Sequence, residues 1–246
     1  MRLAIVSDIH GNLPALEAVV ADFTRRGVDA VINLGDSLSG PLLPRETAHF
    51  LMAQDWVHLA GNHERQILES AAPRGASDAY ARAQLDRAAL EWIAGLGPCM
   101  AYAADVLLCH GSPRSDLEYL LETVEPGGLR LARAAELDER LDGAAAALVV
   151  CGHSHLARCL RTGRGQLVVN PGSVGVPGFV ASQPYPHVVE NGSPDARYAI
   201  VERRGALWQA TLVAVPYDFA PMARLALQRG RVEWHRALAT GYPTGN

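Results

Sequence analysis

The sequence predicts an α/β fold, of the mixed α+β kind, in which a parallel sheet comes first and antiparallel strands follow. In the first quarter of the chain, apolar runs of strand length alternate with amphipathic helical stretches, which is the pattern of parallel βαβ units. After Cys151, short strand-like runs follow one another without helices between them, as antiparallel strands do. The length of 246 residues favours one domain that spans residues 1–246.

The first predicted element is a buried strand at residues 3–6, where apolar residues run together. A helix is expected next, because Asn12 can cap its start, Pro14 suits its first turn and Gly27 can end it. The alternation continues with a strand at 30–34, a helix at 45–53 and a strand at 56–59.

Residues 64–96 have a helical pattern that is broken near Pro73 and Gly75, and we expect helices on the rim of the sheet. The stretch 170–196 is rich in Gly, Pro, Ser and Asn and is predicted to be a long loop, of a kind that is usually functional or mobile. The remaining predicted elements are strands at 106–109 and 147–150 with an Arg- and Leu-rich helix between them, and short strands at 156–161, 166–169, 199–203 and 207–213.

Composition excludes several classes of function. The net charge is −4 and no basic tract occurs, so binding to nucleic acid or to an anionic membrane has no electrostatic support. The chain contains no lysine, which rules out Schiff-base chemistry, a phosphate-loop lysine and a Ser–Lys dyad. Its cysteines have no C-x-x-C spacing, and there is neither a signal-peptide pattern nor an apolar run of membrane length, so we expect a cytoplasmic location.

Polar side chains follow five apolar strands at the points where those strands end. Open parallel sheets bind ligands outside the carboxyl ends of their strands, so these side chains are expected at one edge of the sheet. Residues two apart in an extended segment point to the same side, so the pairs at 8 and 10 and at 153 and 155 could each reach one cluster. The residues are Asp8, His10, Asp36, Asn62, His63, His110, His153 and His155.

Each of these residues alone has an ordinary structural explanation. Asp8 and Asp36 could cap helices, and Asn62 could be a turn residue. Separate structural explanations would require an independent coincidence at every strand end. A shared metal site explains all of these residues together. Carboxylate, amide and imidazole ligands without thiolate suit Mn, Fe, Zn or Co. The set is too large for one catalytic zinc and fits two divalent metal ions with one bridging carboxylate.

The motifs resemble those of the calcineurin-like metallophosphoesterases, and most closely those of compact bacterial members. The resemblance covers nearly the whole chain apart from its C-terminal end. It implies a four-layer sandwich in which two mixed β-sheets lie face to face and are flanked by helices. The matching blocks are Asp8-Ile9-His10-Gly11-Asn12-Leu13, Gly35-Asp36, Gly61-Asn62-His63-Glu64, His110-Gly111-Ser112-Pro113, Gly152-His153-Ser154-His155 and Asn170-Pro171-Gly172-Ser173.

The resemblance also implies a reaction. A hydroxide that bridges the two metals is expected to attack a small phosphomonoester or phosphodiester in line, which would make the chain a phosphatase or phosphodiesterase. His63 is expected to stand over the substrate and to stabilise or protonate the leaving oxygen, without binding metal. The implied ligands are Asp8, His10 and His155 for the first metal, Asn62, His110 and His153 for the second, and Asp36 as the bridge.

Three further residues have two explanations each. Arg114 could bind a substrate phosphate or could be a solvated loop arginine. Glu64 either orients the imidazole of His63 or caps the helix that follows. His187, in the predicted long loop, is expected to be structural or exposed. No aromatic ladder or basic groove indicates a nucleic-acid substrate.

Two alternative functions stay open. Gly35-Asp36-Ser37-Leu38 has the letters of the GDSL serine hydrolases, in which Ser37 would be the nucleophile. That mechanism needs a histidine oriented by a carboxylate, and the Asp-x-x-His block that the family carries near its C-terminus has no counterpart in the C-terminal half of this chain. The second alternative is a catalytically silent binding scaffold of the same fold, and the retention of every implied ligand argues against it.

Overall fold

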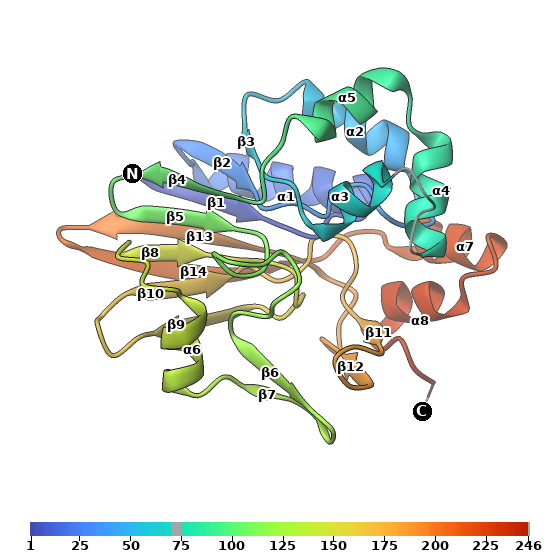
Figure 1. Cartoon of the computed structure of the whole chain (residues 1–246). Helices are drawn as coiled ribbons and strands as arrows, with labels where there is room; N and C mark the ends of the chain where they lie inside the picture. The colour runs from blue at the N-terminus through green and yellow to red at the C-terminus, as the bar shows by residue number, and fades with distance from the viewer. Residues whose placement is uncertain (70–74, 246) are drawn as a thin grey trace.

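The structure, a computed structural model, describes residues 1–69 and 75–245 and contains two five-stranded sheets (Figure 1). The first sheet has the order β14 (Leu207–Val215), β13 (Ala196–Arg204), β1 (Arg2–Val6), β2 (Ala30–Asn33) and β3 (Val57–His58). β2 pairs in parallel with β1 and β3, whereas β13 runs antiparallel to β1 and β14. The predicted parallel start of the chain is therefore confirmed.

The second sheet is also mixed. It has the order β4 (Cys99–Ala103), β5 (Val106–Cys109), β8 (Leu148–Val150), β10 (Leu167–Asn170) and β9 (Arg158–Arg161). β8 pairs in parallel with both β5 and β10, and the edge strands β4 and β9 are antiparallel to their neighbours. The strands after Cys151 are thus only partly antiparallel, because the chain crosses from β9 back into the sheet to place β10 beside β8.

The two sheets lie face to face and share an apolar core. Leu3 and Ile5 of β1 face this core together with side chains of β5, β8 and β10. The alternate residues of β1 point the opposite way, against helix α1 (Leu13–Arg26). Helix α6 (Ala134–Arg140) packs on the outer face of the second sheet. These four layers confirm the predicted sandwich of two sheets flanked by helices.

The segment 64–96 is helical, as predicted, but is divided more finely than its pattern indicated. It contains the end of α3 (Asn62–Leu68), then α4 (Ala76–Gln84) and α5 (Arg87–Ala94), which pack with α2 (Pro44–Met52) at one end of the sheets (Figure 1). Gly75 directly precedes α4, whereas Pro73 lies outside the described residues. A further break occurs at Leu85, after which Asp86 caps α5 by accepting a hydrogen bond from the backbone N of Ala89 at 2.9 Å.

The predicted helix between β5 and β8 is present as α6, but the sequence did not indicate two short hairpins. The region between β5 and β8 contains not only α6 but also a hairpin of β6 (Glu122–Glu125) and β7 (Gly128–Leu131). The stretch 170–196 contains a second hairpin, β11 (Phe179–Ala181) with β12 (His187–Val189). Strands this short carry too few residues for an alternating pattern to be recognised, and turn-rich composition hides them.

The C-terminal end, for which the sequence predicted no element, forms a helical hairpin of α7 (Ala220–Gln228) and α8 (Val232–Thr240). Met222, Ala226 and Leu238 pack there against Leu42 in the loop after β2. The guanidinium of Arg229 donates hydrogen bonds to the carbonyls of Pro41 and Leu42. The hairpin is therefore fixed to a loop that also carries Asp36.

None of the helices in the described ranges 1–69 and 75–245 is long and apolar enough to cross a membrane. The cytoplasmic location stays a prediction.

Candidate metal centre

The backbone is strained at five of the seven candidate metal ligands. In the described part of the chain, six residues other than glycine have a left-handed φ, and five of them are candidate ligands. Such conformations cost about 1–3 kcal/mol each and persist where the surrounding structure imposes them, commonly at functional sites. The five are Asp8 (φ 56°), His10 (52°), Asp36 (53°), His153 (67°) and His155 (57°).

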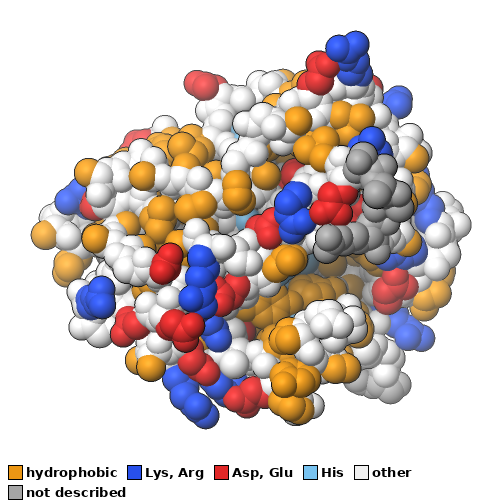
Figure 2. Space-filling view, viewed as in Figure 1, with side chains coloured by type: hydrophobic (Ala, Val, Ile, Leu, Met, Phe, Trp, Pro, Cys, Tyr) orange, Lys and Arg blue, Asp and Glu red, His pale blue; other side chains and the backbone are white. Residues whose placement is uncertain are grey.

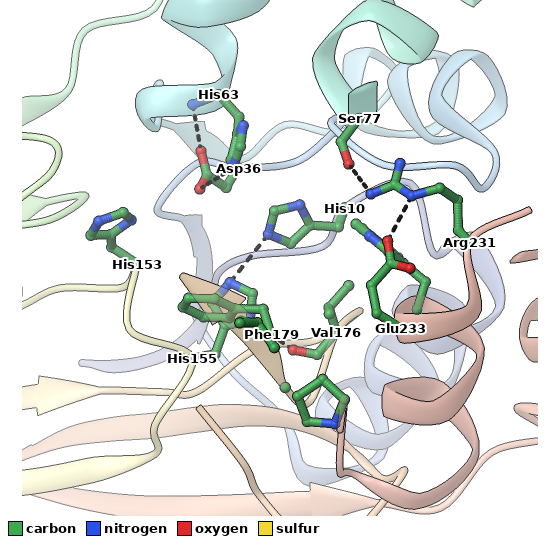
Figure 3. Close-up of a pocket in the computed structure, with 14 residues that line it drawn as sticks. His10, Asp36, His63, Ser77, His153, His155, Val176, Phe179, Arg231 and Glu233 are labelled. Atoms are coloured by element: carbon green, nitrogen blue, oxygen red, sulfur yellow. Dashed lines mark hydrogen bonds and ion pairs between the residues drawn. The ribbon is translucent and has the colours of Figure 1, made fainter. Parts of the chain in front are cut away.

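The first group of ligands consists of Asp8, His10 and His155, each of which offers one ligand atom within 4.8 Å of the others. His10 Nδ1 donates to the carbonyl of Ser39 at 2.8 Å, and His155 Nδ1 donates to the carbonyl of Val176 at 2.7 Å. A carbonyl can only accept, so each Nδ1 carries a proton, and Nε2 is the ring nitrogen that can bind a metal ion. The two Nε2 atoms face each other at 3.2 Å (Figure 3).

Asp8, the third member of this group, has one carboxylate oxygen without a hydrogen-bond partner in the described part of the chain. Its Oδ2 accepts a hydrogen bond from the backbone N of His153 at 3.1 Å. Its Oδ1 is buried, lies 3.4 Å from His155 Nε2 and has no hydrogen-bond partner among the described residues. A buried carboxylate oxygen without a hydrogen-bond partner, beside two inward-facing imidazole nitrogens, can be compensated by a cation, so these residues fit a divalent metal ion.

The second group consists of Asp36, His110 and His153, again within 4.8 Å, with Asn62 beside them. His110 Nδ1 donates to the carbonyl of Leu34 at 2.9 Å, which directs its Nε2 inward. That nitrogen lies 3.1 Å from Asp36 Oδ2 and 3.2 Å from Asn62 Oδ1. The main-chain carbonyl thus fixes the ring of a ligand imidazole, as outer partners of metal sites do.

Electrostatics favour ionised carboxylates in both groups. Burial raises the pKa of Asp8, but the charge and hydrogen bond of His155 outweigh it and lower the pKa below its usual value. Burial likewise raises the pKa of Asp36, but His110 and His63 outweigh it and hold the pKa well below the usual range. Both carboxyl groups are at most 1% exposed, so the site concentrates buried negative charge.

The imidazoles divide into two kinds. Burial and the neighbouring His155 lower the pKa of His10 to about 4, and burial with His110 lowers the pKa of His153 to about 3, so both are neutral as metal ligands must be. Burial also lowers the pKa of His110, but the charge of Asp36 and its hydrogen bond reverse this and raise it to about 10. Binding of a metal by His110 therefore displaces a proton.

His63 is set apart from both ligand groups. It lies at the start of α3, and its Nδ1 is 2.7 Å from Oδ1 of Asp78 in α4. Its Nε2 is 4.0 Å from Asp36 Oδ2, and its side chain is 28% exposed in the pocket of Figure 3. Burial lowers the pKa of His63, but the charge of Asp36 and the hydrogen bond of Asp78 raise it to about 9. No sequence signal pointed to Asp78, because it comes from a helix without a recognisable motif.

Glu64 ties the loops of the site together and does not contact the ring of His63. Its carboxylate accepts hydrogen bonds of 2.8 Å from the backbone N of Asp36, of Ser37 and of Gly61. The capping explanation for this residue therefore fits the structure, since Gly61 precedes α3. The same carboxylate joins the loop after β2 to the loop after β3.

Glycines allow the loops to approach each other closely. A Cβ on Gly61 would overlap the carboxylate of Asp36, and a Cβ on Gly152 would overlap the hydroxyl of Ser7 and come within 3.0 Å of Asp8 Oδ2. Asn170 holds the Gly152 loop from the other side by donating to the carbonyl of Gly152 at 2.7 Å. The glycines in the sequence motifs thus have a packing function beside the ligands.

The other candidates lie away from the ligand groups. Arg114 pairs with Glu118 at 2.7 Å and Glu139 at 3.2 Å and belongs to neither group. His187 is buried; its Nδ1 donates to the carbonyl of Tyr185, and its Nε2 lies 3.1 Å from the hydroxyl of Tyr119, which is a structural arrangement.

Ser37 lacks the partners of a serine nucleophile. Its buried hydroxyl accepts a hydrogen bond from the amide of Asn33 at 2.8 Å, and no histidine among the described residues is bonded to it. The chain does contain one Asp-x-x-His spacing, Asp55 to His58, at β3. The amide of Asn33 lies between that histidine and Ser37, so no base reaches the hydroxyl.

Fold and site together define a metal-dependent phosphoesterase. Residues 1–190 match the calcineurin-like phosphoesterase superfamily domain, and the chain belongs to this superfamily.

Several known proteins are similar to this chain. The crystal structure of a metallophosphoesterase from Sphaerobacter thermophilus is 26% identical, with a TM-score of 0.76 over 98% of this chain and 99% of that chain. A putative diadenosine tetraphosphatase shares the fold at 16% identity, with a TM-score of 0.51 over 86% of this chain and 93% of that chain. An uncharacterized protein of Methanocaldococcus jannaschii is 35% identical over 66 residues, which span only 27% of either chain.

Substitution of Asp36 by Asn is expected to reduce metal binding itself. A neutral amide leaves two dications with less compensating charge, so the variant should contain clearly less than the wild-type amount of metal after equal loading and desalting. Elemental analysis of the two purified proteins measures this, with circular dichroism as the check on folding. A folded variant with unchanged metal content would remove Asp36 from the centre.

Proposed function

We propose that residues 1–246 act as one domain that hydrolyses a small phosphomonoester or phosphodiester with two divalent metal ions, such as Mn, Fe, Zn or Co. The observation that carries the proposal is the pair of adjacent ligand groups, both of which interact with the carboxylate of Asp36. We assign Asp8, His10 and His155 to one ion, Asn62, His110 and His153 to the other, and Asp36 to both.

The ions would supply an activated water and stabilise the charge that develops on the phosphoryl oxygens. The chain's own residues position the ions and the leaving group. The main-chain carbonyls that accept from the Nδ1 atoms of His10, His110 and His155 turn the Nε2 atoms toward the proposed metal sites. Positioning and charge stabilisation of this kind account for most of the catalysis of phosphoryl transfer to water.

His63 is the residue that we assign to proton transfer. The hydrogen bond from Nδ1 to Asp78 leaves Nε2 pointing toward Asp36 and the pocket. A pKa raised to about 9 keeps the ring protonated at neutral pH, so Nε2 can donate to the leaving oxygen. Asp78 acts through His63 and is a positioning residue.

The presence of His63 together with Asp78 argues against a catalytically silent scaffold. Binding alone would not require the protonated imidazole of His63 beside the two proposed metal sites. Nor would it require Asp78, which is 1% exposed, to hold that imidazole in place. The arrangement favours turnover over simple metal-stabilised binding.

Substitution of His63 by Ala should leave the metals bound and slow turnover. Loss of a general acid typically costs about 10²–10⁴-fold in rate, and His63 holds no ligand position in our assignment. Steady-state kinetics on 4-nitrophenyl phosphate and bis(4-nitrophenyl) phosphate, with metal analysis of the same samples, measures both effects. Equal kcat in the two proteins would remove His63 from the mechanism.

Substitution of Asp78 by Asn should lower kcat with little change in KM or metal content, because the amide orients the imidazole less firmly. If Asp78 acts only through His63, adding Asp78→Asn to His63→Ala should cause no further loss, since effects of residues that act as a unit are not additive. Kinetics of the two single variants and the double variant test this. A double variant that loses the sum of both effects would show that Asp78 acts independently.

A further inference from the structure

A pocket opens directly from the proposed catalytic residues toward the C-terminal helices. Its volume is about 280 Å³, and His10, His63 and His155 form its inner wall (Figure 3). Its outer wall comes from Phe179 of β11 and Trp234 of α8, with Val176 before β11 and Pro243 after α8. Figure 2 shows the hollow in this region of the surface, with histidine side chains at its bottom and hydrophobic side chains along it.

Two aromatic rings in this wall lie against the proposed ligands of the first metal. The ring of Phe179 stands edge-on to His155 with 4.7 Å between centroids, and the ring of Trp234 stands edge-on to His10 with 5.9 Å between centroids. Both aromatic residues are only partly buried, so part of each ring faces the pocket. Any substituent of a bound phosphoryl group that enters this pocket comes within reach of both rings.

Contacts with the loop that carries Asp36 fix the position of Trp234. Gly40 lies in that loop, and a Cβ at Gly40 would come within 2.6 Å of the indole ring. The ring therefore rests on a glycine, and the hydrogen bonds of Arg229 to the carbonyls of Pro41 and Leu42 hold the helical hairpin there. A side chain placed in this way gives a preformed surface for a flat group.

The charges of the pocket wall cancel. The guanidinium of Arg231 is paired with Glu233 at 2.7 Å and donates to the hydroxyl of Ser77 at 3.1 Å (Figure 3). In the described part of the chain these are the charged side chains that the wall contributes besides the catalytic histidines and Asp36. The pocket thus favours a neutral aromatic group over a second anionic one.

We propose that the substrate of this enzyme carries a neutral aromatic group, such as a nucleobase, and that Phe179 and Trp234 bind it. The inference rests on the proposed function and adds a substrate class to it. Phe179 lies within residues 1–190 that match the superfamily domain, whereas Trp234 of α8 lies beyond them. The larger cavity beside it, of about 870 Å³, also reaches His63 and His153 and has room for the rest of the substrate.

A pair of substrates that differ only in the aromatic group tests the inference. Adenosine 5′-monophosphate and ribose 5-phosphate have the same reacting linkage, and each is assayed as the monoester and as its methyl diester with the manganese-loaded enzyme. The wild-type protein should prefer the adenosine compound by roughly tenfold or more in kcat/KM, in line with the usual strength of base stacking. Trp234→Ala and Phe179→Leu should each reduce this preference, mainly through KM.

Tyr185→Ala provides the matched control, because Tyr185 is an exposed aromatic residue of the same hairpin and lines neither cavity. It should keep the wild-type preference. Hydrolysis of both compounds at equal kcat/KM, or a preference that survives both pocket substitutions, would overturn the aromatic pocket while leaving the proposed function intact. Failure to hydrolyse these four compounds and the 4-nitrophenyl esters would instead contradict the proposed function, and the inference with it.

Discussion

The structure depends on how it holds two buried carboxylates among inward-facing imidazole nitrogens. Asp8 and Asp36 are almost fully buried, and the inward nitrogens of His10, His110 and His155 face them because the outer nitrogens donate to main-chain carbonyls. Two buried carboxylates close together are unfavourable alone, since buried charge requires a compensating partner. Divalent cations bound by the candidate ligands would provide that partner, so we expect the folded core, and not only the reaction, to require metal.

The convergence of the candidate ligands requires a strained backbone just after several strands. The candidate ligands follow β1, β2 and β3 of one sheet and β5 and β8 of the other, so the candidate site lies where the carboxyl ends of these strands meet (Figure 1). The left-handed conformations at Asp8, Asp36 and His153 turn the chain sharply just after each strand. Each is unfavourable alone, and the common core of the two sheets, with the loop contacts made by Glu64, holds them in place.

Sequence reasoning found the residues whose position follows from a strand. His110 and His153 each come at or just after the end of an apolar run, and the carboxyl ends of parallel strands converge, so their meeting could be predicted. Asp78 and Trp234 could not be found in this way, because helices deliver them and tertiary packing alone decides which helix face meets the site. The role of Glu64 had two equal local explanations, and only the placement of the β2 loop decides between them.

The short hairpins and the C-terminal helices could not be predicted from the sequence either. β11 and β12 have three residues each, too few to show a strand pattern, yet β11 carries Phe179 into the pocket. The shared fold and the ligand motifs thus follow from local patterns, whereas the outer wall of the pocket depends on contacts between distant segments. Substrate choice, which such a wall governs, is the property least visible in the sequence.

Anomalous diffraction from a crystal grown with manganese tests the central claim most directly. The account predicts two peaks per chain, roughly 3.5–4 Å apart, one ringed by Asp8, His10 and His155 and the other by Asn62, His110 and His153, with Asp36 between them. A single peak, or no peak with these side chains turned away from one another, would contradict it.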